Sequence, residues 1–140
     1  MAMHPIVRNS LAVIAGVVVG GLANITLVNI GPSIVPLPEG ADVSTTEALA
    51  DSMKLFEPIN FLFPFLAHAI GTLAGAFVAA KIAVSHQFKF AMLIAVFFLA
   101  GGIAAVNMFG GPLWFKITDL VLAYIPMGYL GAVLAGKSRQ

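Results

Sequence analysis

The segment from Phe61 to Lys81 constrains the fold most, because it carries no charge until its last residue. About twenty apolar residues in a helix are enough to cross the ~30 Å hydrocarbon core of a bilayer. Small residues recur at every fourth position of this segment: Ala67, Gly71, Gly75 and Ala79. This spacing puts them on one helical face, which predicts the close approach of a second helix.

The composition of the whole chain agrees with a membrane protein. Of its 140 residues, 60% are hydrophobic and only 9% are charged, whereas a soluble domain has about a quarter of its residues charged. We therefore predict an all-α integral membrane protein with a single domain over residues 1–140. Four transmembrane helices are expected, at residues 11–30, 61–81, 90–109 and 117–136.

The connection over residues 31–60 is the one long loop. Ser44 and Glu47 have the spacing of a capping box. A short amphipathic helix is therefore expected near residues 45–56, where it would lie along the membrane surface. A plain solvated loop is the alternative.

The distribution of charge predicts the orientation. Basic residues gather at the chain ends and in the turn before the third span: Arg8, Lys81, Lys89, Lys137 and Arg139. The carboxylates all fall on the other side: Glu39, Asp42, Glu47, Asp51, Glu57 and Asp119. The positive-inside rule then predicts cytoplasmic N- and C-termini, with an extracytoplasmic loop at 31–60. We expect the location to be the bacterial inner membrane.

The second and fourth spans share a sequence pattern. Residues 66–81 align without gaps on residues 122–137, and the identical positions include small residues. This similarity predicts two tandem helical hairpins related by a pseudo-two-fold axis along the membrane normal. His68 would then occupy the place of Tyr124. Helix packing is expected at the glycines of the small-residue rows: Gly16, Gly20, Gly71, Gly75 and Gly131.

Polar side chains within membrane spans face the bundle interior or a water-filled cavity as a rule. Five of them fall in the outer half of the predicted spans and form a candidate polar pocket: Asn24, His68, Asn107, Asp119 and Tyr124. A structural role is the alternative for each. His68 could hydrogen-bond a carbonyl of a neighbouring helix, and Asn24 could join two helices by a hydrogen bond. Asp119 could lie near a helix N-terminus, where the helix dipole favours a carboxylate.

The chain lacks the residue sets of several functional classes. It has no cysteine and no phosphate-binding loop, and His68 has no partners at metal-ligand spacing. We therefore expect no metal and no cofactor, and enzymatic activity is disfavoured. A net charge of +1 argues against a nucleic-acid partner.

Three functions stay open from the sequence. The leading hypothesis is a transport- or channel-type protein that uses the polar pocket. The alternatives are a non-catalytic accessory or scaffold subunit of a membrane complex, and a lipid-binding or lipid-modifying membrane protein. The lipid bilayer is the partner expected in each case. A second copy of the chain or a membrane partner protein is a further expected partner.

Overall fold

The computed structural model describes residues 2–137, and this part of the chain is helical without a strand. Four helices in it are long and apolar enough to cross a membrane, as the sequence predicts. Arg139, which contributed to the predicted orientation, lies outside the described residues. The elements in chain order are α1 (Pro5–Ile34), α2 (Thr46–Ser52), η1 (Met53–Leu55), η2 (Pro58–Phe61), α3 (Leu62–Ile82), α4 (Gln87–Phe109), α5 (Leu113–Leu122) and α6 (Ile125–Leu134).

Helix α1 is longer than the predicted span at 11–30. Its 30 residues correspond to a length of about 45 Å. Pro5 stands in the first turn, where its missing N–H needs no partner, and the His4 side chain accepts a hydrogen bond from the Ile6 N–H. Pro32 lies within the last turn of the helix, which ends at Ile34.

The fourth span is two helices, which differs from the continuous helix expected at 117–136. Helix α5 ends at Leu122, and α6 begins at Ile125 after a break at Ala123 and Tyr124. Pro126 explains the break, because it has no N–H to donate to the Leu122 carbonyl and sits in the first turn of α6. The break places Tyr124 between the two helices.

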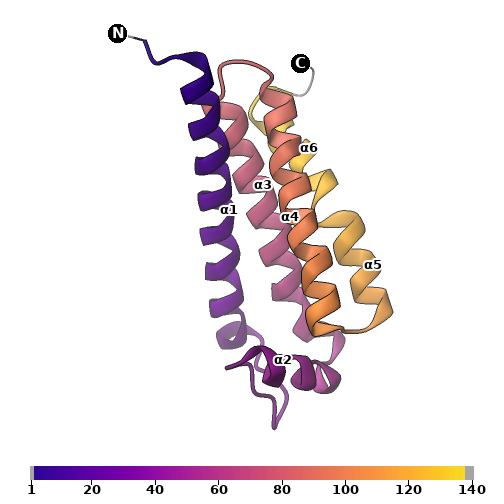
Figure 1. The fold of residues 1–140 in the computed structure, drawn as a ribbon. Helices are drawn as coiled ribbons and strands as arrows, with labels where there is room; N and C mark the ends of the chain where they lie inside the picture. The colour runs from indigo at the N-terminus through magenta and orange to yellow at the C-terminus, as the bar shows by residue number, and fades with distance from the viewer. Residues whose placement is uncertain (1, 138–140) are drawn as a thin grey trace.

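Helix α3 occupies the centre of the bundle and packs against α1, α4 and α6. Helix α1 and the α5–α6 span lie on opposite sides of this central pair of α3 and α4 (Figure 1). The predicted hairpin repeat has no support in this arrangement. A two-fold axis that relates the hairpins would pack α1 on α6 as α3 packs on α4, and it would require α3 to be broken as its aligned segment is.

The α1–α3 contact depends on two pairs of glycines. A Cβ added to Gly16 would lie 2.8 Å from the Gly75 carbonyl oxygen, and one added to Gly75 would lie 2.5 Å from the Gly16 oxygen. Gly20 and Gly71 meet in the same reciprocal way, at 2.7 and 2.8 Å. Because these approaches are too short for any side chain, the two backbones touch only where both helices carry glycine.

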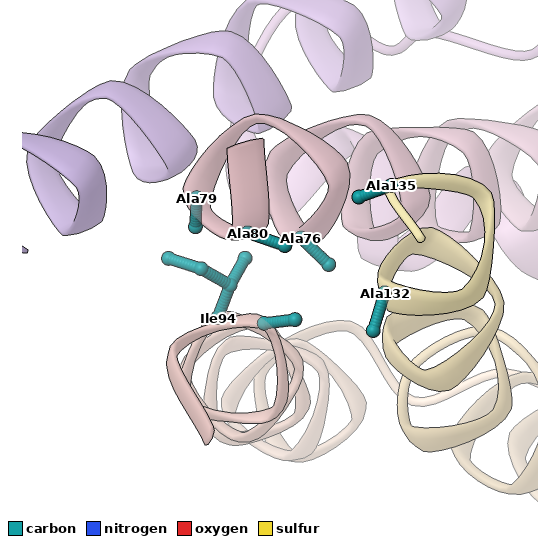
Figure 2. Close-up of a cluster of buried hydrophobic side chains, with 7 residues drawn as sticks. Ala76, Ala79, Ala80, Ile94, Ala132 and Ala135 are labelled. Carbon is teal, nitrogen blue, oxygen red and sulfur yellow. The ribbon is translucent and has the colours of Figure 1, made fainter. Parts of the chain in front are cut away.

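Alanines fill the other side of α3. Figure 2 shows Ala76, Ala79 and Ala80 of α3 directed toward Ile94 of α4 and toward the C-terminal part of the chain. Ala132 and Ala135 complete this buried cluster. Gly131 also belongs to this contact, since a Cβ there would lie 2.7 Å from the Leu73 carbonyl oxygen. Small residues thus set the helix spacing on both sides of α3.

The loop between α1 and α3 closes one end of the bundle (Figure 1). It contains the short helix α2, whose N-cap is Thr45, one residue after the predicted Ser44. The Thr45 hydroxyl accepts a hydrogen bond from the Ala48 N–H at 3.1 Å. Buried Asn60 fastens the loop to the end of α1 by donating to the Pro36 carbonyl oxygen.

The glycine contact predicts a sharp difference between two Gly→Leu variants. Gly75→Leu forces a side chain between two backbones, and overpacking of this kind costs about 1–3 kcal/mol. Gly21→Leu is the matched control, because a Cβ at Gly21 meets nothing within 4 Å. We expect a lower melting temperature in detergent for Gly75→Leu alone. Equal melting temperatures for the two variants would contradict the placement of α1 on α3.

Candidate functional site

A carboxylate and an imidazole meet inside the membrane-spanning part of the bundle. The His68 Nδ1 atom lies 2.8 Å from Asp119 Oδ1 and 3.0 Å from Asp119 Oδ2. The pair joins α3 to α5, and Asp119 is only 2% exposed. An ionisable group at this depth is costly unless it is paired. His68 is therefore the partner that makes the buried Asp119 tolerable.

Tyr124 completes the pair as a three-residue cluster. Its hydroxyl donates a hydrogen bond to Asp119 Oδ2 at 3.2 Å, and its ring stacks on the His68 ring with centroids 5.7 Å apart. The break between α5 and α6 gives Tyr124 this position. Gly102 of α4 makes room for it, because a Cβ at Gly102 would collide with the Tyr124 hydroxyl.

The hydrogen bonds define the roles of the two His68 nitrogens. The Asp119 carboxylate is an acceptor, so the Nδ1 atom facing it carries the hydrogen. The Nε2 atom is then left for other partners, as an acceptor in the neutral ring or as a donor in the imidazolium. The His68 side chain is 23% exposed, in contrast to the buried Asp119. The exposed part of the ring is thus available to a ligand.

A cavity of about 170 Å³ lies beside the His68–Tyr124 ring pair. Helices α1, α3 and α4 and the α5–α6 break all contribute to its walls. The residues that line it are Asn24, His68, Gly71, Thr72, Phe98, Gly101, Gly102 and Tyr124. It therefore joins polar groups from several helices within the membrane-spanning part of the bundle.

Thr72 carries the least expected feature of this cavity. It is 1% exposed, and its buried hydroxyl has no hydrogen-bond partner among the described residues. Thr26 and Thr118, by contrast, donate to the carbonyl four residues earlier at 2.8 and 2.7 Å. A buried hydroxyl without a partner costs about 1–3 kcal/mol. Thr72 is among the lining residues, but its hydroxyl oxygen is itself buried and does not open into the cavity.

The predicted pocket residues divide into three groups. Asn24, His68 and Tyr124 line the cavity, and Asp119 lies behind His68. Asn107 differs from the sequence-based expectation, because it is exposed on α4 and does not line the cavity. Its helix turns that position outward.

Five residues that line the cavity were not predicted as part of the pocket: Gly71, Thr72, Phe98, Gly101 and Gly102. Gly71 was predicted only as a packing residue. Thr72 follows His68 by one helical turn, and the sequence places both in one polar row of the same helix face. The two adjacent glycines of α4 resemble a packing motif in the sequence. Only the position of the Tyr124 ring reveals that Gly102 makes room for the site.

A larger cavity of about 420 Å³ lies between the α2 loop and the α4–α5 turn. Its walls are mostly apolar and aromatic. Lys54 is the one charged residue that lines it, and this side chain already pairs with Asp51 at 3.0 Å. This cavity therefore lacks the convergent polar groups found beside His68.

The described residues contain no group of three or more His, Asp or Glu side chains that could hold a metal ion. Comparison with protein-family models, with curated proteins and with solved structures found no match for this chain. The chemistry of the cavity is therefore inferred from its own residues.

The cluster predicts unequal effects of two Tyr→Phe variants. Tyr124→Phe keeps the stacked ring but removes one hydrogen bond to the buried Asp119, which should cost about 1 kcal/mol of stability. Tyr129→Phe is the matched control, because Tyr129 is 51% exposed on α6. We expect denaturation in detergent to show a loss for Tyr124→Phe only. An equal stability of both variants would contradict the bond from Tyr124 to Asp119.

Proposed function

We propose that this protein is a membrane transport protein that binds a small polar solute in the cavity between α1, α3 and α4. The observation that carries the proposal is the His68 ring, which lines the cavity while its Nδ1 atom is bonded to the buried Asp119 carboxylate. Ionisable residues within membrane spans are rare, and they mark solute and ion pathways in many transport proteins.

The accessory-subunit alternative fits the site less well. A purely structural polar cluster satisfies its own groups, as Asp119 does with His68 and Tyr124. The His68 ring departs from this pattern, because it lines the cavity and its side chain is 23% exposed.

Size disfavours lipid binding in the cavity beside His68, whereas the mostly apolar cavity at the α2 loop measures about 420 Å³. Sites for drug-sized molecules have volumes of about 300–1,000 Å³, and the cavity beside His68 measures about 170 Å³. This volume suits a solute of a few heavy atoms better than an acyl chain.

Each residue has a defined part in the proposed site. The Asn24 amide and the His68 Nε2 atom supply hydrogen bonds to the solute. Phe98 and Tyr124 form aromatic walls. Asp119 acts through His68, whose ring it orients.

The proposed orientation places the α2 loop outside the cell and both termini in the cytoplasm, in a bacterial inner membrane. The support is the charge distribution, with Arg8, Lys81 and Lys89 at the end of the bundle opposite the α2 loop. In this orientation the cavity lies in the outer half of the bundle, on the side from which an external solute arrives.

Vesicle swelling tests the transport proposal. Liposomes with the purified protein are moved into isosmotic urea, glycerol, ammonium chloride or sodium formate, and solute entry is followed by light scattering. We expect faster swelling than in empty liposomes for at least one solute. Gly101→Leu should abolish the gain, because Gly101 lines the cavity and a Cβ there meets nothing within 4 Å.

Gly21→Leu is the control for this experiment, since it adds the same side chain to open space on α1, away from the cavity. It should swell as the wild type does. The transport proposal is wrong if no solute enters faster than in empty liposomes, or if Gly101→Leu and Gly21→Leu swell at the same rate.

A further inference from the structure

The charges around the cavity restrict what it can hold. Asp119 contributes one negative charge, and the His68 imidazolium contributes one positive charge when it is protonated. The other elements that pack on His68 present no further charge: α1 contributes Asn24, α4 contributes Phe98 and two glycines, and the α5–α6 break contributes the neutral Tyr124. The site is therefore neutral with His68 protonated and negative without that proton.

A net charge in the hydrocarbon region is costly, so the neutral state is favoured. An occupant that preserves neutrality can enter in two ways. An uncharged solute can join the protonated site, or a monovalent cation can replace the proton of His68. An anion would restore a negative charge beside Asp119, and it is disfavoured for that reason.

We propose that the cavity binds a small protonated amine in exchange for the proton on His68. This inference rests on the proposed function and names the solute class of the same site. In the exchange, the imidazolium gives its Nε2 proton to water as the ammonium group arrives. The Nε2–H bond breaks, an O–H bond of hydronium forms, and the total charge of the site remains zero.

The polar groups of the cavity match an ammonium group. Neutral His68 presents the Nε2 lone pair as an acceptor, and Asn24 presents a side-chain oxygen. These two groups can accept hydrogen bonds from two of the three N–H donors of a primary ammonium group.

The aromatic walls favour an organic cation over a metal ion. Phe98 and Tyr124 line the cavity, and the faces of aromatic rings attract ammonium groups. A transition-metal ion such as Zn²⁺ needs several His or carboxylate ligands, and the described residues offer no such group. An amine of a few heavy atoms also fits the volume of about 170 Å³.

The α2 loop adds a long-range preference of the same sign. Five of the six carboxylates in the sequence lie between residues 31 and 60: Glu39, Asp42, Glu47, Asp51 and Glu57. A surface with this charge raises the local concentration of cations and lowers that of anions. The approach to the bundle from this end therefore also favours a protonated amine.

Proton release on ligand binding tests the inference directly. The purified protein in detergent, in weakly buffered solution, is titrated with methylammonium chloride, while calorimetry follows binding and a pH-indicator dye follows protons. We expect about one proton to be released for each amine bound. The apparent affinity should also weaken by up to about tenfold for each unit of falling pH, because protons compete for the site.

Variants assign the effect to this site. Asp119→Asn removes the negative charge and should weaken methylammonium binding by roughly tenfold or more. His68→Gln keeps an amide facing Asp119 but has no proton to exchange, so any remaining binding should release none. Asn107→Ala is the control, since Asn107 is exposed away from the cavity, and it should bind and release as the wild type does.

The outcomes separate this inference from the transport proposal. Binding of methylammonium without proton release, or equal binding by Asp119→Asn, overturns the exchange. Binding of sodium formate with proton uptake overturns the choice of a cation.

Solute entry into liposomes without amine-linked proton release leaves the transport proposal standing and contradicts the amine exchange. Proton release without solute entry supports the amine site and removes transport. If Asp119→Asn does not fold, His68→Gln and the wild-type pH dependence still decide.

Discussion

The hydrogen bonds between Asp119 and His68 are the interaction on which the interior of this bundle depends. A lone carboxylate within a membrane span is among the most costly groups that a helix can carry. Here it is held by an imidazole on another helix and by the hydroxyl of Tyr124, at 2.8 to 3.2 Å. Without these partners, α5 could not bury Asp119 against α3.

The backbone packing makes this cluster geometrically feasible. Glycine contacts bring α1 directly onto α3, and alanines bring α4 and α6 onto its other side. Pro126 interrupts the fourth span, and the resulting break at Ala123 and Tyr124 follows Asp119 by about one turn. The break lets Tyr124 turn its ring between α3 and α4. The same features that shape the bundle thus also leave a small polar cavity beside His68.

The sequence predicts the coarse structure well, because hydrophobic length and glycine spacing are local properties. The four spanning helices and the small-residue face of α3 follow from them. The sequence predicts a continuous fourth span and not the break at Tyr124, since the effect of Pro126 depends on whether neighbours satisfy the freed carbonyl. The repeat has no structural support, because similar Gly- and Ala-rich faces serve different contacts in α3 and α6. Asn107 and Thr72 show that depth along a helix does not determine which way a side chain points.

The charge state of Asp119 is the central claim, and infrared spectroscopy measures it most directly. The protein is labelled with ¹³C-aspartate, and the spectrum of Asp119→Asn is subtracted at neutral pH. This removes the signals of Asp42 and Asp51, the other aspartates of the chain. The account predicts a carboxylate stretching band for Asp119, matched by an imidazolium signal from His68. A band of a protonated carboxylic acid would contradict it.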